Sequence, residues 1–331
     1  MRDVALRAPV RVAALGMYVP QHVVTNDDLA RLVETSDEWI VQRTGIRTRR
    51  RVAENEFASD LALSAVRDLL RAHPDVDVKD IDYVLVASTT PDYVYPSIAA
   101  IVQDRLGIPT SCGALDVSAA CAGFCSILNL GAALIVSGQA RNVLIIATET
   151  LTRSIDYSDR ATCVLFGDGA CAALIVRDER CALAGMDSGS DGSAGPALYR
   201  TAMRRDIGGN PDGSGLLRQV GRDVYRWVLE NIPLTVDRIL DRAGVSLDEI
   251  DWFIPHSANM RMIEALCKRI GFPIERTLES IVEFGNTSAV SIPLALTPAV
   301  RNGTVKSGDR LLIVGFGGGL VSAGAVLTWL D

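Results

Sequence analysis

The amino-acid sequence predicts an α/β protein built from two similar halves. Short runs of branched residues at 81–88 (IDYVLVAS), 142–149 (NVLIIATE), 251–256 (DWFIPH) and 310–317 (RLLIVGFG) are typical of buried strands in a parallel or mixed sheet. Amphipathic helical patterns lie between these runs, for example at 59–72 and at 224–244, where Pro233 predicts a kink or a break. Alternation of the two patterns indicates the α/β class.

An internal repeat supports the two halves. The segment DIDYVLVASTTPD resembles EIDWFIPHSANM, and from Asp82 to Asp251 the offset is 169 positions. Likewise SGQARNVLIIATE resembles KSGDRLLIVGFGG, and from Ser137 to Ser307 the offset is 170 positions. Two separate segments with one offset predict fused halves related by a pseudo-twofold axis. We therefore expect a first half at 1–180, a loop-rich connection at 181–218, where Gly and Ser are frequent, and a second half at 219–331.

Composition excludes several classes of protein. Of the 331 residues 48% are hydrophobic and 22% charged, and the net charge of −7 argues against nucleic-acid binding. Seven cysteines without a Cys-x-x-Cys pair, together with three histidines, predict neither a disulfide framework nor a metal site, and no motif calls for a cofactor. Residues 1–15 lack the apolar core of a signal peptide, and no apolar run is long enough to cross a membrane, so we expect a cytoplasmic protein without membrane insertion.

Cys121 is the first candidate for chemistry. It follows a strand-like run, in DVSAACAGFCS (116–126), and begins an apolar helical pattern. Unpaired N–H groups at a helix N-terminus favour a thiolate, and the small neighbouring residues permit close approach of an acyl group. Cysteine is equally common as a small hydrophobe in buried helices, and this local pattern leaves both interpretations open. Cys125, one turn further along, fits packing better.

Two polar residues occupy related positions in the second half. His256 follows the strand pattern at 251–255, and Asn286 precedes an apolar helical pattern. Alone, each fits a structural role, His256 as a satisfied buried side chain and Asn286 as a helix N-cap. In the repeat register the helices after Cys121 and Asn286 correspond, so the three side chains are expected to converge at the carboxyl ends of the strands. The glycines of GFGGGL (315–320) would offer N–H groups there to an oxyanion.

These segments resemble one family. TSDEWIVQRTGIRTRR (35–50), DVSAACAGF, DRATCVLFGDGA (159–170), DWFIPHSAN, GNTSAVSIPLAL and GFGGG are similar, in this order, to motifs of the β-ketoacyl-acyl carrier protein synthase III family of thiolase-like condensing enzymes. The resemblance implies a five-layered αβαβα fold, a homodimer and an acyltransferase of fatty acid synthesis. In the family a cysteine takes an acyl group from acyl-CoA, and malonyl-acyl carrier protein then loses CO₂ and attacks it.

The resemblance also implies roles for individual residues. Cys121 would be the nucleophile, His256 and Asn286 would hold the malonyl thioester carbonyl, and the N–H groups of Cys121 and Gly318 would form an oxyanion hole. The other implied positions are a CoA site of Trp39, Arg160, Thr35, Arg43 and Asn259, an acyl pocket bordered by Phe316 and by Tyr95 of the partner subunit, and a carrier-protein contact at Arg261. Tyr95 and Ser257 stand where a well-described member has Phe and Gln, which leaves the acyl-chain preference open.

Two alternative functions remain at this point. One keeps the scaffold but changes the reaction, as an acyltransferase to an alcohol or amine or as a chain-specific condensing enzyme of secondary metabolism. The other is a Cys-His-Asn hydrolase of the papain type, for which the order of the three residues is right. Because the CGSCW signature of such hydrolases is missing, the sequence favours condensation.

Overall fold

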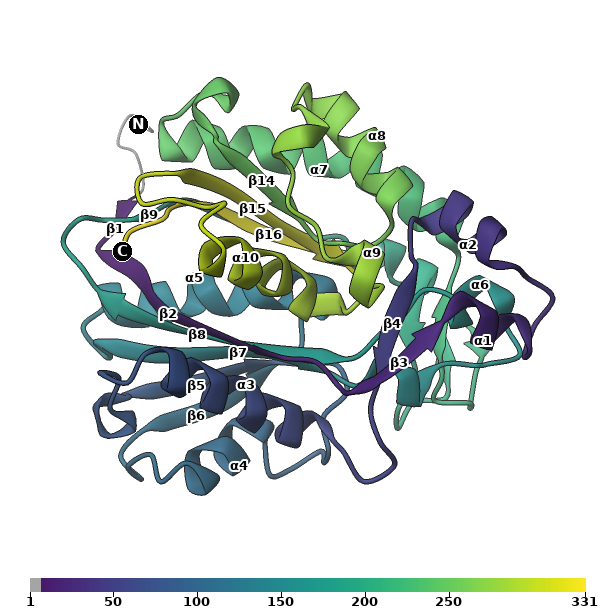
Figure 1. Ribbon diagram of the computed structural model, residues 1–331, viewed down its shortest axis with the longest axis horizontal. Coiled ribbons are helices and arrows are strands. Elements are labelled where there is room, and N and C mark those ends of the chain that lie inside the picture. Colours follow the sequence, from purple (N-terminus) through teal and green to yellow (C-terminus); the bar gives the residue numbers. More distant parts are fainter. Residues whose placement is uncertain (1–6) are drawn as a thin grey trace.

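The computed structural model describes residues 7–331, so the first six residues of the N-terminal segment lie outside the described part of the chain. Its core is two five-stranded mixed sheets, which confirms the predicted class (Figure 1). The first sheet has the order β2-β8-β7-β5-β6 and the second the order β1-β9-β16-β15-β14. The strands of the first sheet are β2 (Val10–Tyr18), β5 (Tyr83–Ala87), β6 (Gly113–Val117), β7 (Asn142–Glu149) and β8 (Gly169–Arg177). Those of the second are β1 (Arg7–Ala8), β9 (Leu183–Ser190), β14 (Trp252–Pro255), β15 (Arg310–Gly317) and β16 (Val321–Thr328).

Helices complete five layers (Figure 1). The outer layer on the first sheet holds α3 (Ala58–Ala72) and α4 (Ile98–Arg105), and the outer layer on the second holds α7 (Gly221–Ala243) and α8 (Met260–Ile270). Between the sheets lie α5 (Gly123–Val136) and α10 (Ser291–Arg301). Because α5 contacts strands of both sheets, it is apolar on nearly all sides, as a fully buried helix must be.

The repeat is visible in the strand pairing. In the first sheet β5 and β7 are parallel neighbours, and β7 pairs antiparallel with β8, which pairs antiparallel with β2. In the second sheet β14 and β15 are parallel, and β15, β16 and β9 pair antiparallel in the same succession. In each half, the carboxyl ends of a parallel strand pair therefore lie beside one central helix.

Smaller elements form a lobe beside the layers (Figure 1). They are β3 (His22–Thr25), β4 (Thr48–Arg51), α1 (Asn26–Ala30), α2 (Asp37–Thr44), α6 (Arg160–Cys163) and α9 (Ile281–Phe284). Two short hairpins add β10 (Leu198–Arg200) with β13 (Leu217–Gln219), and β11 (Asp206–Ile207) with β12 (Asn210–Pro211). Single 3₁₀ turns are η1 (Val78–Asp80), η2 (Ala120–Ala122), η3 (Leu151–Ser154), η4 (Gly192–Ala197), η5 (Leu247–Glu249), η6 (Ile274–Arg276) and η7 (Ser288–Val290).

The structure differs from two expectations. The connection expected at 181–218 is not loop-rich at its start, because β9 (Leu183–Ser190) is an inner strand of the second sheet. The strand pairs through its backbone groups. The glycines and serines of its sequence, LAGMDSGS, interrupt the run of branched residues by which a buried strand is predicted. Of the kink or break expected at Pro233, the break does not occur, because helix α7 continues through this residue.

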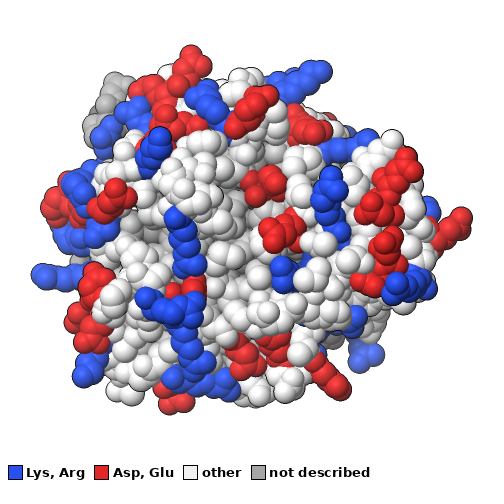
Figure 2. Space-filling view, viewed as in Figure 1, with Lys and Arg blue, Asp and Glu red and all other residues white. Residues whose placement is uncertain are grey.

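Surface charge and hydropathy agree with the composition. Figure 2 shows Lys and Arg interspersed with Asp and Glu over one face, with uncharged surface between them. Within residues 7–331, no helix combines the length and the apolar character needed to cross a membrane. The same residues hold no cluster of His, Cys, Asp and Glu suited to a metal ion.

Candidate active site

One cavity of about 1180 Å³ runs from the surface to the carboxyl ends of the central strands. Ten of the twelve residues predicted from the sequence line it: Trp39, Arg43, Cys121, Arg160, His256, Asn259, Arg261, Asn286, Phe316 and Gly318. The predicted set is therefore a spatial cluster, although its members come from segments up to about 280 positions apart.

Cys121 lies in a tight turn at the N-terminus of the central helix. It is the middle residue of η2, directly before α5, and the preceding Ala120 adopts a left-handed backbone conformation with φ of 43°. The end of β15 passes so close that a Cβ on Gly317 would lie 2.7 Å from the Cys121 sulfur. This turn and the glycine together fix the thiol at the inner end of the cavity, next to the N–H of Gly318.

The predicted thiolate is not the resting state of Cys121. Burial raises the pKa of its thiol to about 11, and hydrogen bonds from the Ser288 hydroxyl and the Gly318 N–H only partly offset that effect. Loss of hydration outweighs the field of the helix N-terminus, because the side chain is buried. The free protein therefore holds a neutral thiol, whose proton must leave when the sulfur forms a bond.

His256 is a neutral hydrogen-bond donor. Burial lowers its pKa to about 3, so the ring is uncharged at neutral pH. Its Nδ1 lies 2.7 Å from the Ser291 hydroxyl. The oxygen of that hydroxyl accepts the N–H of Ser257 at 3.2 Å. Since no other acceptor is in reach of the Ser291 proton in the described network, it goes to Nδ1, which leaves the hydrogen of His256 on Nε2. Phe316 packs edge-on against the ring, with centroids 5.5 Å apart.

Asn286 is oriented by its own backbone. Its Oδ1 accepts the N–H of Ser288 at 2.9 Å, which turns the Nδ2 amide away from that turn. The main chain is anchored by hydrogen bonds that its N–H and C=O make to Leu165 and Gly167. Asn286 is not the expected helix N-cap, because Thr287 and Val290 are the N-caps of η7 and α10. Its oxygen instead closes a turn onto Ser288, which leaves the amide nitrogen to donate.

The Cys-His-Asn hydrolase interpretation fails on these contacts. In such a hydrolase the histidine pairs with the thiolate and is oriented by the asparagine. Here His256 pairs with Ser291, and the oxygen of Asn286 is occupied by Ser288. The three side chains therefore converge as separate groups rather than as a linked triad.

An aromatic and cationic surface forms the mouth of the cavity. The guanidinium carbon of Arg160 lies 4.9 Å from the centre of the Trp39 ring, and that of Arg43 lies 5.9 Å from it. The Asn259 amide donates to the backbone oxygen of Arg43, and Arg261 donates to Gln42, so α8 is tied to α2. A flat ring flanked by guanidinium groups suits a planar base that carries phosphates.

Two predicted residues do not line the cavity. Tyr95 is 85% exposed and points out of its own chain, whereas the neighbouring Tyr93 and Val94 do reach the cavity wall. Thr35 precedes the Ser36 N-cap of α2, and its buried hydroxyl has no hydrogen-bond partner in the structure.

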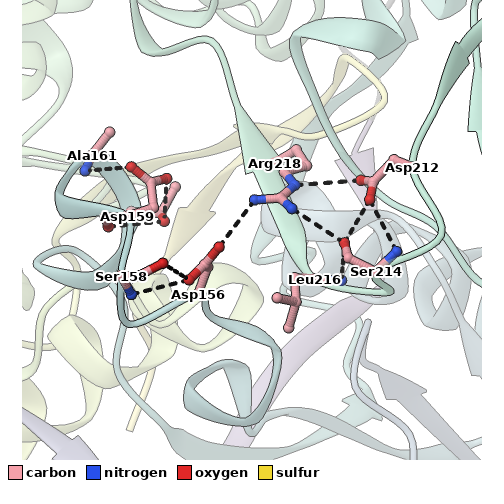
Figure 3. Close-up of polar contacts among 9 residues, drawn as sticks. Asp156, Ser158, Asp159, Ala161, Asp212, Ser214, Leu216 and Arg218 are labelled. Carbon is pink, nitrogen blue, oxygen red and sulfur yellow. Dashed lines mark hydrogen bonds and ion pairs between the residues drawn. The ribbon is translucent and has the colours of Figure 1, made fainter.

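A polar network holds one wall of the mouth (Figure 3). Arg218 lies between Asp156 and Asp212, at 3.4 and 3.5 Å, and so links the segment before α6 to the hairpins at 198–219. Ser158 donates to Asp156, and Asp159 caps α6, which begins with Arg160. No pattern in the sequence predicts this network, because its members come from two loops without periodicity.

Two further residues lie close to the thiol without a sequence motif that marks them. Ser288 opens η7 with a φ of 53° and touches the Cys121 sulfur. Glu149, the last residue of β7, is fully buried and hydrogen-bonds to Thr89, Thr90 and Ser288. No sequence signal could have placed them, since each is one common residue inside an apolar or small-residue segment.

Comparisons with known proteins agree with this geometry. Two family models match the chain, 3-oxoacyl-[acyl-carrier-protein (ACP)] synthase III over residues 115–192 and its C-terminal part over residues 240–329. A β-ketoacyl-[acyl-carrier-protein] synthase III of Bacillus subtilis is 48% identical, over 96% of this chain and 98% of the relative. The Halalkalibacterium halodurans relative is 47% identical, over 96% of each chain.

Solved structures extend the similarity to three dimensions. The synthase III of Thermus thermophilus is 42% identical, with a TM-score of 0.92 over 96% of this chain and 99% of that one. The priming β-ketosynthase of the R1128 polyketide pathway is 35% identical, with a TM-score of 0.91 over 99% and 98% of the two chains. The chain belongs to the 3-oxoacyl-[acyl-carrier-protein] synthase III family, the thiolase-like acyltransferases that carry out the initiating condensation of fatty acid synthesis.

Proposed function

We propose that this enzyme condenses an acyl-CoA primer with malonyl-acyl carrier protein through an acyl group carried on Cys121. The observation that carries the proposal is the convergence of a buried thiol, two neutral donors and an aromatic-cationic mouth on one cavity. A cysteine thioester is reactive enough to be passed on, and the buried position of Cys121 limits its contact with the bulk water that would hydrolyse it.

In the first half-reaction Cys121 attacks the primer carbonyl. Negative charge develops on the carbonyl oxygen, and the N–H groups of Gly318 and Cys121 donate hydrogen bonds to it. The position of Gly318 supports this assignment, because its N–H lies close enough to the attacking sulfur to lower the pKa of the Cys121 thiol. Preorganised backbone donors of this kind supply roughly 10²- to 10³-fold in rate.

In the second half-reaction His256 and Asn286 stabilise the enolate that decarboxylation of the malonyl group leaves. The hydrogen on Nε2 of His256 and the Nδ2 amide of Asn286 both donate to the thioester oxygen. A histidine with a pKa of about 3 stays neutral, so it donates a hydrogen bond without protonating the carbanion. The carbanion then attacks the acyl group on Cys121 and forms the new carbon–carbon bond.

The mouth of the cavity binds the CoA portion of the primer. Trp39 and Arg160 sandwich the adenine, Arg43 and Asn259 contact the phosphate-bearing part, and Thr35 stands at the same edge. Phe316 borders the acyl end beside His256. The exposed guanidinium of Arg261 provides a positive contact for the acidic carrier protein.

A homodimer would complete the acyl pocket. Tyr93, Val94 and Tyr95 form an exposed apolar run, with Tyr95 at 85% exposure, beside the cavity wall. Pairing two chains through this run would bury it and bring the Tyr95 ring of one subunit to the acyl pocket of the other. The enzyme acts in the cytoplasm, where both substrates are found, and without a metal or a bound cofactor.

The proposal is tested by following both products with purified protein. Acetyl-CoA and malonyl-acyl carrier protein should give one CO₂ for each 3-oxoacyl product, and acetyl-CoA alone should give one acetyl adduct by intact mass. Cys121→Ser should remove the adduct, whereas Cys125→Ser, a buried neighbour, should keep it. Branched and longer acyl-CoA primers added in turn define chain preference. An adduct that persists in Cys121→Ser would sink the proposal.

A further inference from the structure

A buried carboxyl group outside the proposed machinery stands one side chain away from the nucleophile. Glu149 is 0% exposed, and none of the ion pairs within residues 7–331 includes it. An unpaired ionisable group in this position is costly for the fold, and such groups gather where chemistry needs them. The roles assigned above to Cys121, His256 and Asn286 leave Glu149 unexplained.

The hydrogen bonds around Glu149 favour its ionised form. The N–H and hydroxyl of Thr89 donate to the carboxylate at 2.9 to 3.2 Å, and the Thr90 hydroxyl donates at 2.8 Å. Thr90 is a donor here because its oxygen already accepts the N–H of Thr150 at 2.8 Å. Burial opposes these bonds and raises the pKa of Glu149 to about 7, so the group can both hold and release a proton near neutral pH.

Ser288 connects Glu149 to the thiol. The turn η7, which Ser288 opens, packs against β7, which ends at Glu149, and against η2, which holds Cys121. The Ser288 hydroxyl therefore lies close enough to influence the pKa of both groups. The left-handed backbone of Ser288, with φ of 53°, is a strained conformation for a non-glycine residue, and the bond from its N–H to Asn286 holds it there. The backbone at Ser288 is therefore held in one conformation beside both groups.

We propose that Ser288 and Glu149 form a proton relay that activates Cys121 for acylation. This inference rests on the proposed function, because it assumes that Cys121 carries the acyl group. His256 cannot take the thiol proton, since its ring accepts from Ser291 on Nδ1 and resists protonation until far below neutral pH. Glu149 acts on the sulfur through Ser288, whose hydroxyl touches the reacting atom.

The step balances without any further reactant. As the sulfur–carbon bond to the primer forms, the S–H proton passes to the Ser288 oxygen, and the Ser288 hydroxyl proton passes to the carboxylate. The carbonyl π-electrons move to the oxygen in the oxyanion hole. When the adduct collapses, the bond to the CoA sulfur breaks, and the relay runs in reverse to protonate the leaving thiolate. Glu149 then returns to its ionised form.

The test compares rates of acetyl adduct formation on Cys121 between pH 6 and pH 9. Glu149→Gln and Ser288→Ala should each slow acylation about 100-fold, the size expected for a proton acceptor. The double variant should be no more than about twofold slower than the slower single variant, because the two groups act in one relay. The wild-type rate should rise through about pH 7, and this rise should be absent in Glu149→Gln.

Controls separate the relay from a merely structural role. Glu275→Gln, at an exposed position, should acylate like wild type, and Glu149→Asp should recover part of the rate. Condensation by enzyme that has been acylated beforehand should change less than threefold in Glu149→Gln. If Glu149→Gln acylates within threefold of wild type, or loses both half-reactions equally with an unchanged pH profile, the relay is wrong. If wild-type protein forms no adduct on Cys121, the proposed function itself fails, and the relay with it.

Discussion

The two halves of the molecule build the same turn twice and use it differently. In the first half, Ala120 with φ of 43° opens η2 and α5 follows; in the second, Ser288 with φ of 53° opens η7 and α10 follows. From 120 to 288 the offset is 168 positions, close to the offsets seen in the sequence repeat. The scaffold thus supplies two strained turns beside the carboxyl ends of parallel strands.

The residues at matching positions divide the chemistry. Cys121 corresponds to Ala289, so one turn carries the proposed nucleophile and the other carries none. At the ends of the central strands, Glu149 of β7 corresponds to Gly317 of β15, which is 168 positions further on. Glu149 places a carboxyl group close to Ser288. Gly317 has no side chain and so leaves room for the Cys121 thiol. One backbone plan therefore gives the first half the proposed acyl carrier and the second half the proposed side-chain donors.

Moving the thiol to the other turn is the strongest way to break this comparison. Cys121→Ala combined with Ala289→Cys keeps one cysteine in a 3₁₀ turn, yet condensation should fall more than about 10⁴-fold, because the backbone donors at Gly318 surround only the first turn. Ala289→Cys alone controls for the added volume and should keep acetylation of Cys121. Condensation by the double variant above one hundredth of wild type would show that the turns are interchangeable.

Removing a donor from the second half should affect one half-reaction only. His256→Ala is expected to lower the rate of CO₂ release from malonyl-acyl carrier protein about 10²- to 10³-fold, the size of one lost oxyanion donor. Acetylation of Cys121 should change less than about threefold, since the His256 ring has no hydrogen bond to the sulfur. Rapid-quench measurement of both half-reactions checks this, and equal losses in the two would contradict the division.

A methyl group on Gly317, where β15 passes close to Cys121, should displace the thiol. In Gly317→Ala the new Cβ would lie 2.7 Å from the Cys121 sulfur, a separation that real Cβ atoms do not tolerate. Misplacement by about 1 Å costs roughly 10²-fold, so acetylation should slow by about that factor while the fold is kept. Gly192→Ala, where a Cβ meets no atom within 4 Å, is the matched control and should acylate normally.

The two halves should also respond oppositely to pH. Burial raises the pKa of Glu149 to about 7, so its contribution to stability is present below the unfolded pKa of about 4.5 and is lost as pH rises toward 7. Burial lowers the pKa of His256 to about 3, so its contribution is present above about 6.5 and is lost as pH falls toward 3. Each slope is limited to about 1.4 kcal/mol per pH unit.

Urea unfolding at several pH values measures both slopes. Relative to wild type, Glu149→Gln should gain free energy of unfolding as pH rises from 4.5 to 7, and His256→Asn should gain it as pH falls from 6.5 to 3. Constant differences across these windows would mean that neither group titrates differently in the folded and unfolded states.

The sequence predicted the repeated part of this arrangement. Asp82 and Asp251 revealed the two halves, and the position of Cys121 before an apolar helix predicted its place at a helix N-terminus. These features are regular, so periodicity and offset carry them. The family motifs then predicted ten of the residues that line the cavity.

The missed features depend on contacts that sequence spacing does not encode. Glu149 appears as the polar end of an apolar strand, and only the fold brings it within reach of Ser288. The thiol pKa of Cys121 was expected to fall at the helix N-terminus, but it rises because burial is the larger effect. Strand β9 was hidden because its pairing uses backbone groups rather than an apolar pattern.

Trapping the acyl group between the two halves tests the central claim most directly. Asn286→Ala is incubated with acetyl-CoA and malonyl-acyl carrier protein together, and intact and peptide mass spectrometry locate the acetyl group while CO₂ release is counted. The account predicts that close to one acetyl group per chain accumulates on Cys121 with CO₂ release reduced at least 100-fold. Condensation at the wild-type rate, or an acetyl group on another cysteine, would contradict it.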